Sequence, residues 1–265
     1  MSFKIISAEE RMSQPRRIKA AIFGPSGVGK TSLLRSLTIP ALFVDLEGGD
    51  LSIADCPVDS IKLRRWEEAR DLACLIGGPN LAAQPTEPYS LAHFQHVESQ
   101  LGKREDVLGK YELLFLDSIT VLSRMCMVWA EVQPENIAKN GAKDTRGAYG
   151  LMGREMLKLL THVQHTADKH VIFVGILDAK TDDFNRPVWE PQMEGSKVGR
   201  ELPGIVDEVL SMVTMDDPEQ PGVKHRVFVT QQANQWGYPA KDRSGRLDPI
   251  ERADLQHIIT KIQAQ

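Results

Sequence analysis

The residues best placed to do chemistry form a glycine-rich stretch, GPSGVGKT, at residues 24–31. It follows the apolar run AAIF and precedes the helix-like LLRSL. It matches the pattern G-x-x-x-x-G-K-[S/T], whose glycines let backbone N–H groups wrap around a phosphate, and the helix that follows adds a favourable dipole. The sequence therefore predicts a nucleotide phosphate site built from Gly24, Pro25, Ser26, Gly27, Val28, Gly29, Lys30, Thr31 and Ser32.

Two side chains of this loop have specific expected roles. Lys30 would reach the β- and γ-phosphates of ATP, and the Thr31 hydroxyl would ligate Mg²⁺. Such a loop needs a second metal anchor, an acid at the end of a neighbouring apolar strand. The segment LLFLDS, a Walker B pattern, ends in Asp117 and Ser118. We therefore expect Asp117 to hold Mg²⁺ through water.

A second acidic strand end offers a candidate for the residue that activates water. The segment FVDLEGG carries Asp45 and Glu47. A carboxylate that is not bound to the metal can take the proton from the attacking water, and Glu47 is our candidate. Asp45 is the weaker candidate because it points to the opposite face from its neighbours. For both Asp117 and Glu47 the alternative is an ordinary helix cap or solvated turn.

The rest of the chain alternates apolar strands with amphipathic helices, which is typical of an α/β protein with a parallel sheet covered on both faces. A predicted antiparallel pair of strands ends the pattern, and long irregular stretches interrupt it. The predicted strands are 18–23, 41–47, 58–63, 112–118 and 170–177, with the antiparallel pair at 205–215 and 226–232; the helices are 29–37, 66–76, 91–108, 119–131, 149–169 and 249–263; the irregular stretches are 77–88, 134–148 and 178–203.

Bulk properties narrow the class of protein. The apolar content of 42% suits a buried core, and the net charge of −4 confines any nucleic-acid contact to particular loops. The three scattered cysteines favour neither a disulfide framework nor a zinc site. No apolar run approaches the ~18 residues of a membrane span, so we expect a cytoplasmic protein without membrane contact. We expect an N-terminal extension at 1–16 and a single domain at 17–265.

The order of these motifs resembles the RecA-like branch of P-loop ATPases: a P-loop, a strand ending D-x-E, then an apolar strand ending D-S. In that family the carboxylate after the second strand is the catalytic glutamate, which corresponds to Glu47. More narrowly, GPSGVGKT with DLEGG, AYGLMGREMLKLL, HVIFVGIL and WGYPAKDR resembles the compact phage ATPases related to RecA, which anneal single strands in recombination. The resemblance covers 18–260. It implies Mg²⁺-dependent ATP hydrolysis and a RecA-like, mostly parallel sheet with an antiparallel C-terminal extension.

Two features depart from the family pattern. RecA carries a polar glutamine at the end of the strand that matches 170–177, where this chain has Gly175, Ile176 and Leu177. The coupling of hydrolysis to DNA is therefore in doubt. The chain also lacks a long basic N-terminal helical domain, so oligomer contacts made by that domain would have to be made elsewhere.

The resemblance implies that two loops, at 134–148 and 179–203, hold single-stranded DNA. Basic residues on phosphates and aromatic rings on bases are a common way to bind single strands, and the second loop carries Phe184 and Trp189. Four acids balance four bases there, so an ordinary solvated loop or substrate lid stays an alternative. The basic candidates are Lys139, Lys143, Arg146, Arg186, Lys197 and Arg200.

The segment AKDRSGR at 240–246 supplies a candidate for a residue that acts on a neighbouring subunit. RecA-like rings and filaments place basic residues near this position, where they reach the neighbour's γ-phosphate and stabilise charge on the transferring group. Lys241 and Arg243 are our candidates, and a solvated turn is the alternative.

Three function classes compete. The first is an ATPase of DNA recombination or annealing that binds single-stranded DNA as a homo-oligomer, either a ring or a filament, with a single-strand binding protein or a replication protein as a candidate partner. The second is a nucleotide-switched loader or regulator that acts on a protein. A small-molecule kinase is disfavoured, since the arginine-poor segment 119–133 offers no arginine-rich lid.

Overall fold

A computed structural model describes residues 5–14, 16–138, 140–181, 184–185, 187–217 and 219–264. Within these ranges, strands join in a sheet of order β10-β8-β7-β1-β5-β4-β2-β3, with β6 paired to β5 and β9 to β7. Their bounds are β1 Lys19–Gly24, β2 Ala41–Asp45, β3 Asp59–Lys62, β4 Leu113–Asp117, β5 His170–Thr181, β6 Pro187–Pro191, β7 Glu208–Asp216, β8 Lys224–Val229, β9 Lys241–Asp242 and β10 Ile250–Arg252.

The strands from β7 through β1, β5, β4 and β2 to β3 are parallel, and β8 and β10 add antiparallel strands at one edge. This arrangement confirms the predicted fold class, a mostly parallel α/β sheet with antiparallel C-terminal strands. The central strands β1, β2 and β4 are buried along their whole length. Their continuous apolar sequences follow from this burial on both faces.

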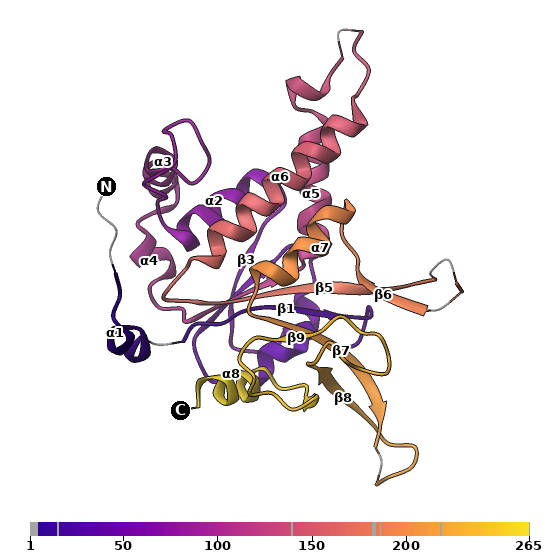
Figure 1. The fold of residues 1–265 in the computed structure, drawn as a ribbon. Helices are drawn as coiled ribbons and strands as arrows, with labels where there is room; N and C mark the ends of the chain where they lie inside the picture. Colours follow the sequence, from indigo (N-terminus) through magenta and orange to yellow (C-terminus); the bar gives the residue numbers. More distant parts are fainter. Residues whose placement is uncertain are drawn as a thin grey trace.

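Helices cover both faces of the sheet (Figure 1). The larger core lies under α2, α5, α6 and α7, and the smaller one under α8 and the short helix η1. The helices are α1 Ala8–Ser13, η1 Thr31–Ser36, η2 Asp50–Ile53, α2 Trp66–Gly77, α3 Leu91–Leu101, α4 Arg104–Leu108, α5 Ile119–Glu131, η3 Pro134–Asn136, α6 Thr145–Gln164, α7 Ser196–Ile205 and α8 Leu255–Gln263. Among the described residues, none of the helices has the length and apolarity needed to cross a bilayer.

The prediction of a structureless segment at 134–148 was wrong at both ends. Residues 134–136 form η3, and α6 begins at Thr145 because the Asp144 side chain accepts the Gly147 N–H at 3.0 Å. The amphipathic spacing had predicted a start at residue 149. The Asp144 N-cap starts the helix four residues earlier, in a polar turn that the spacing does not detect.

The prediction of an irregular stretch at 178–203 was also wrong. Strand β5 continues to Thr181 and pairs antiparallel with β6, and α7 follows from Ser196. The backbone hydrogen bonds between β5 and β6 hold this polar hairpin together. In addition, Trp189 of β6 packs on Tyr238 with ring centroids 5.1 Å apart. In Figure 1 the hairpin projects beyond the body of the sheet.

Three predicted helices differ in detail. The helix after the P-loop is a 3₁₀ helix that begins at Thr31 and ends at Ser36. The helix predicted at 91–108 breaks into α3 and α4 at Gly102, whose φ of 102° is left-handed. The last helix begins at Leu255, since residues 250–252 pair with β8 as β10.

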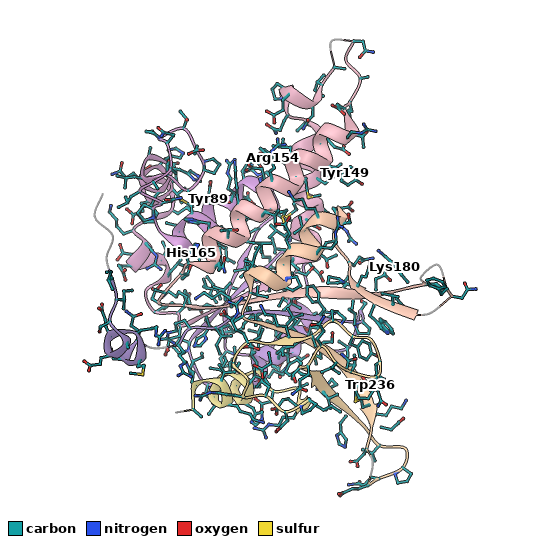
Figure 2. All side chains as sticks on the ribbon, viewed as in Figure 1. Tyr89, Tyr149, Arg154, His165, Lys180 and Trp236 are labelled. Atoms are coloured by element: carbon teal, nitrogen blue, oxygen red, sulfur yellow. The ribbon has the colours of Figure 1, made fainter. Side chains whose placement is uncertain are left out.

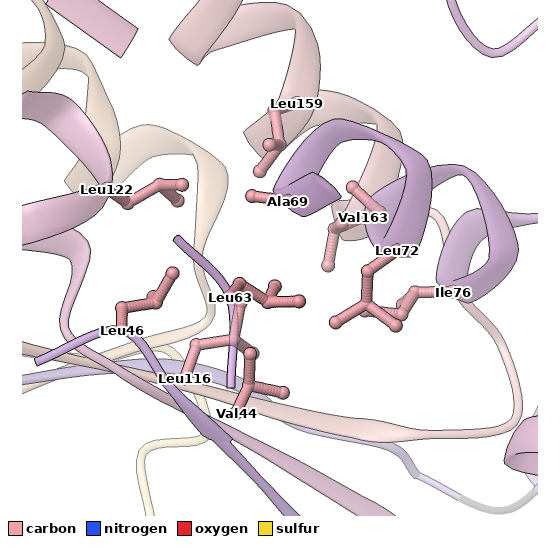
Figure 3. A pocket seen from close by; sticks show the side chains of 11 residues that line it. Val44, Leu46, Leu63, Ala69, Leu72, Ile76, Leu116, Leu122, Leu159 and Val163 are labelled. Carbon is pink, nitrogen blue, oxygen red and sulfur yellow. The ribbon is translucent and has the colours of Figure 1, made fainter. Parts of the chain in front are cut away.

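A small apolar void lies between the sheet and the helical layer (Figure 3). Its free volume is ≈ 10 Å³, about that of a single water probe, and its lining carries no charged side chain. It is therefore a packing defect of the core and not a ligand site. The side chains around it are Val44, Leu46, Leu63, Ala69, Leu72, Ala73, Ile76, Leu116, Leu122, Leu159 and Val163.

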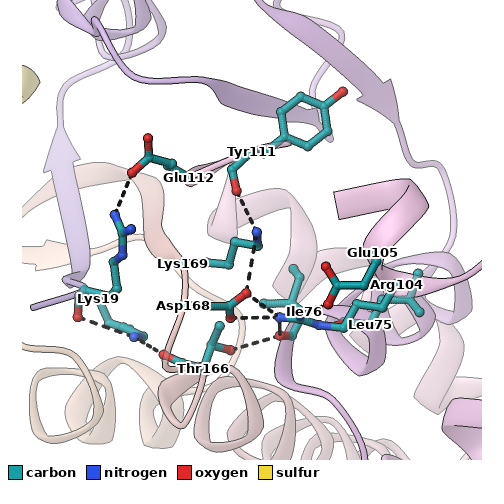
Figure 4. A network of polar contacts seen from close by, with 11 residues as sticks. Lys19, Leu75, Ile76, Arg104, Glu105, Tyr111, Glu112, Thr166, Asp168 and Lys169 are labelled. Carbon is teal, nitrogen blue, oxygen red and sulfur yellow. Dashed lines mark hydrogen bonds and ion pairs between the residues drawn. The ribbon is translucent and has the colours of Figure 1, made fainter. Parts of the chain in front are cut away.

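A polar network connects the segments at the edge of the sheet where the parallel strands begin (Figure 4). The buried Lys19 donates to the Thr166 carbonyl, and the buried Lys169 donates to the Tyr111 carbonyl at 2.7 Å. Arg104 joins α4 to the Leu75 carbonyl at 2.7 Å. These contacts satisfy buried cations with backbone carbonyls, so the network is structural.

Candidate active site

The predicted site residues converge because their strands are parallel and end at one edge of the sheet. The P-loop follows β1, Asp117 ends β4, and Asp45 ends β2 directly opposite Asp117 in the register. Strand β5 lies between β1 and β4, with Ile176 opposite Gly24. The fold thus brings Lys30, Thr31 and the two strand-end acids to the same edge.

The P-loop has the backbone that a phosphate cradle requires. Gly27 and Gly29 have backbone φ angles of 78° and 95°, values that residues with a Cβ rarely adopt. Gly24 is needed for another reason, because a Cβ there would lie 2.5 Å from the Met212 carbonyl oxygen. This donor-rich, open loop fits the phosphates of ATP.

Lys30 is folded onto its own loop. Its Nζ donates to the carbonyl oxygens of Gly24 at 2.8 Å and Pro25 at 2.9 Å. Burial lowers the pKa of Lys30, although Asp117 and Glu47 oppose the shift. The ammonium is therefore positioned within the loop, where it can exchange a carbonyl for a phosphate oxygen.

Thr31 and Asp117 form the expected pair for a metal. The Thr31 hydroxyl donates to Asp117 Oδ2 at 2.5 Å. Burial, with a smaller contribution from Glu47, raises the pKa of Asp117 to about 6. Oxygen ligands of this kind are those that Mg²⁺ prefers, so the pair fits the ion. When bound with ATP, Mg²⁺ would neutralise charge on the β- and γ-phosphates.

Glu47 lies beside this pair and is held by Ser118. The Ser118 hydroxyl donates to Glu47 Oε1. The Ser118 Oγ also caps α5, because it accepts the Val121 N–H at 3.3 Å. Glu47 is exposed and bonds neither Thr31 nor Asp117. Its carboxylate can therefore accept a proton from water next to the metal pair.

Asp45 has a structural role that explains why it is not the base. It is buried, and its Oδ1 accepts the N–H groups of Glu47, Gly48 and Gly49 at 3.2, 2.6 and 3.2 Å. This carboxylate shapes the turn that presents Glu47 at the edge of the sheet. The sequence had ranked Asp45 below Glu47 as a base, but it had not indicated this supporting role.

One residue beside the P-loop was missed by sequence reasoning. Arg226 lies on β8 opposite Thr214, and a Cβ placed on Gly29 would meet its Nη1 at 2.2 Å. The guanidinium therefore lies directly against the phosphate loop. Guanidinium groups bind phosphates with paired N–H donors. No local pattern marks Arg226, since it is one of three consecutive polar residues at the start of β8, far along the chain from the P-loop.

Lys241 and Arg243, the candidates for reaching a neighbouring subunit's γ-phosphate, lie away from the P-loop of their own chain. Strand β9 pairs with the first residues of β7, at the end of the sheet opposite the P-loop. Lys241 donates to the carbonyls of Pro203 and Val206 at 2.5 and 2.8 Å, and Arg243 pairs with Asp207 at 2.9 Å. The structure does not bring them to the P-loop of their own chain.

The basic residues expected to contact DNA are spread over several elements. Lys139 and Arg186 lie outside the described residues. Lys143 pairs with Glu131 at 2.7 Å. Arg146, Lys197 and Arg200 lie on α6 and α7, not on irregular loops, which corrects their predicted setting. Lys197 lies beside the start of α6, where the two helices border a hollow of ≈ 590 Å³.

A mostly parallel α/β sheet whose carboxyl edge carries a P-loop, a Thr–Asp pair and an adjacent glutamate is typical of a P-loop ATPase. A family model described as the AAA domain matches residues 16–244. The chain belongs to this AAA-domain family. No curated protein matches the chain.

Solved structures similar to the chain share little sequence with it. A KaiC-like protein from the hyperthermophilic archaeon Pyrococcus horikoshii OT3 is 12% identical with a TM-score of 0.40, over 82% of this chain and 79% of that one. The RadB recombinase is 14% identical with a TM-score of 0.36, over 81% of each chain. An ATPase from the type III secretion system of pathogenic bacteria is 16% identical with a TM-score of 0.40, over 74% of this chain and 51% of that one.

Proposed function

We propose that the protein is a Mg²⁺-dependent ATPase that binds single-stranded DNA as a homo-oligomer and acts in phage-type recombination or strand annealing. In this proposal residues 1–16 are an N-terminal extension and 17–265 are one RecA-like domain of a cytoplasmic protein. The observation that carries the ATPase part is the convergence of Thr31, Asp117 and Glu47 at the end of the P-loop strand.

Each residue of the site has one task in hydrolysis. The backbone of the P-loop and Lys30 bind the phosphates, and Thr31 with Asp117 holds the metal. Glu47 takes the proton from the attacking water, while Asp45 and Ser118 fix its position. Arg226 adds a cation beside the loop that stabilises the charge of the triphosphate.

The DNA part is supported by the position of basic and aromatic groups around α6 and α7. Lys197 and Tyr149 border one hollow between these helices, and Arg146 lies one turn before it on α6. Tyr149 is partly exposed and can stack on a base. A strand bound here would lie between the two segments that the family resemblance assigns to DNA.

The proposal is tested by ATPase rates with and without single-stranded DNA at low salt, because phosphate contacts weaken with salt. Sizing with and without ATP tests assembly. We expect stimulation by DNA and growth of the particle with ATP. If single-stranded DNA neither stimulates ATP hydrolysis nor binds the protein at low salt, the DNA part of the proposal is wrong. Arg243→Ala that keeps full ATPase activity at every protein concentration would remove the role of Lys241 and Arg243 in a neighbouring site.

A specific observation favours the second candidate, a nucleotide-switched loader or regulator that acts on a protein. Several cations of the two segments that the resemblance assigns to DNA are already paired within the chain: Lys143 with Glu131 and Lys180 with Glu190 at 2.7 Å, and Lys197 with Glu201 at 3.8 Å. A protein with ATP-dependent assembly but no DNA affinity would fit this candidate.

A further inference from the structure

A preformed hollow lies away from the nucleotide site, between the segment that joins α2 to α3 and the outer face of α6. Its volume of ≈ 820 Å³ lies within the range of ligand pockets. None of the P-loop residues, nor Asp117 or Glu47, lines it. In Figure 2, Tyr89, Arg154 and His165 mark its setting along α6. The lining residues are Gly77, Pro79, Asn80, Leu81, Ala83, Glu87, Pro88, Tyr89, Arg154, Leu157, Lys158, Thr161, His162, His165 and Lys197.

The wall formed by residues 78–90 is held in place by its own hydrogen bonds. The Asn80 N–H donates to the Tyr89 carbonyl at 2.8 Å, and the Gln84 N–H donates to the Glu87 carboxylate at 2.7 Å. The Tyr89 ring stacks on His162 of α6 with centroids 4.2 Å apart. The segment is therefore fixed to α6, and the hollow exists before anything binds, which lowers the entropic cost of binding.

The charge of the hollow differs from that of the chain. The protein carries a net charge of −4, but three cations, Arg154, Lys158 and Lys197, line the hollow with a single acid, Glu87. Burial lowers the pKa of His162 to about 4, so this ring is neutral at pH 7 and adds apolar surface. The hollow is thus a basic region on an acidic protein.

All three cations have acidic neighbours, and a ligand can replace the two that are exposed, Glu135 and Glu201. Arg154 lies 3.8 Å from Glu135 and Lys197 lies 3.8 Å from Glu201, and all four side chains are largely exposed. Lys158 pairs more closely with Glu155, at 3.1 Å. The exposed ion pairs of Arg154 and Lys197 contribute little to stability, about 0–1 kcal/mol, so exchanging the carboxylate there costs little. Lys158 is half-exposed and can bind a second carboxylate while it stays paired with the buried Glu155.

The apolar part of the lining decides which kind of anion fits. Leu81 is 77% exposed, and Leu157, Pro79 and Pro88 line the hollow with it. Single-stranded nucleic acid binds largely by stacking bases on ring faces. The ring at this place, Tyr89, is only 4% exposed because it lies against His162. A nucleic acid would therefore find phosphate contacts here but, apart from the exposed His165 imidazole, no ring on which to stack a base.

We propose that this hollow binds an acidic peptide segment of a partner protein. Leucine or phenylalanine side chains of the peptide pack against Leu81, Leu157 and the prolines, and its carboxylates pair with Arg154, Lys158 and Lys197. The charge complementarity specifies the partner's chemistry, and the fixed wall specifies an extended or single-turn segment. This site shares none of the ATPase residues, and Lys158 and Leu81 belong to it alone, whereas Arg154 and Lys197 also border the hollow assigned to DNA above.

The probe is a displayed library of random peptides of about twelve residues, selected on the full-length protein. Selected peptides are then synthesised with a fluorophore and titrated by anisotropy. We expect enrichment of aspartate or glutamate next to leucine or phenylalanine. Binding should weaken at least about tenfold in Lys158→Glu and in Leu81→Ser, and it should weaken with salt.

Two matched variants control for general effects of charge and apolarity. Lys103→Glu reverses a lysine that is also ion-paired, with Glu98 at 3.0 Å, but lies outside the hollow. Val128→Ser removes another exposed apolar side chain, on α5. Both should keep peptide affinity. Unchanged ATP affinity and thermal unfolding in all four variants show that the fold and the nucleotide site are intact.

Several outcomes would overturn the proposal. One is the selection of basic peptides or of no peptides, and another is equal peptide affinity in Lys158→Glu and wild type. If an oligothymidylate competes with the peptide in wild type but not in Lys158→Glu, the hollow would be assigned to nucleic acid. A change of oligomeric state in Lys158→Glu or Leu81→Ser without peptide would assign it to a second copy of the chain. Loss of DNA-stimulated ATPase activity alone would concern the proposed function and leave the peptide site standing.

Discussion

Replacing Arg226 by alanine removes a cation from the surface of the phosphate loop and leaves the rest of the site in place. The guanidinium lies so close to Gly29 that a Cβ there would meet Nη1 at 2.2 Å. The backbone of residue 226 stays in the β7–β8 ladder opposite Thr214. Because Lys30, Thr31 and Asp117 are untouched, we expect a protein that folds and still binds ATP, but more weakly.

The size of the effect follows from the contact it removes. A hydrogen bond to a charged group is worth about 1.5–3 kcal/mol, which corresponds to roughly 10–150-fold in Kd. Arg226 is exposed, so solvent screens its charge and the loss should lie near the lower end, about tenfold at low salt. Arg226→Lys keeps the charge but not the planar fork, and it should lose part of this affinity.

The assay is a titration of wild type and variants with fluorescent ATP, ADP and AMP analogues at two salt concentrations. Arg226→Ala should lose most affinity for ATP and least for AMP, because the guanidinium faces the phosphate loop. Lys224→Ala is the matched control, since Lys224 is an exposed cation two residues away on the same face of β8, 3.8 Å from Asp216. It should bind all three nucleotides as wild type does.

Two results would refute this reasoning. One is an ATP affinity of Arg226→Ala within about twofold of wild type at low salt. The other is an equal loss for AMP and ATP, which would indicate a general disturbance of the loop. A defect that arises only at concentrations where the protein assembles would place Arg226 in a neighbour's site and not in its own.

The other predictions concern the chemistry and the stability of the domain. Lys30→Ala should abolish nucleotide binding or turnover, measured by calorimetry and phosphate release. Glu47→Gln should bind ATP with near-normal Kd but scarcely hydrolyse it; normal turnover would exclude Glu47 as the base. Ser118→Ala should lower kcat more than ATP affinity, because Glu47 loses the hydroxyl that positions it, and Ser118→Thr should restore part of the rate. Burial and the nearby Asp242 raise the pKa of Glu208 from 4.5 to about 8. The folded state thus keeps a proton that the unfolded state loses, so this contribution to stability is complete below about pH 4.5 and is lost as the pH rises through about 8, by up to ~1.4 kcal/mol per pH unit. Urea unfolding of Glu208→Gln should show a flatter decline over this range, and an unchanged slope would contradict the assignment.

The nucleotide site was predictable because its determinants are local. The spacing that ends in Lys30 and Thr31 specifies a loop, and the apolar run before Asp117 specifies a strand end. Parallel strands then place both at the same edge of the sheet, whatever the loops between them do. Glu47 could be proposed for the same reason, since it follows another buried strand.

The polar segments were not predictable by the same reasoning. Hydrophobic periodicity detects elements that pack on a core, whereas the β5–β6 hairpin extends beyond the core and is held by its backbone ladder and the contact between Trp189 and Tyr238. The start of α6 depends on one capping side chain, Asp144, in a polar run. Arg226 could not be found because its proximity to Gly29 arises only when β8 joins the sheet.

The missing polar residue at the end of the strand that matches 170–177 had put the coupling of hydrolysis to DNA in doubt, and the structure offers a different physical connection. Ser118 both holds Glu47 and caps α5. At its far end α5 carries Glu131, which pairs at 2.7 Å with Lys143, just before α6. A movement of that segment on ligand binding would act on α5, and through its first turn on the glutamate. If hydrolysis is coupled to DNA as proposed above, we expect the coupling to run along α5 and its strength to depend on Ser118 more than on any residue at the end of β5.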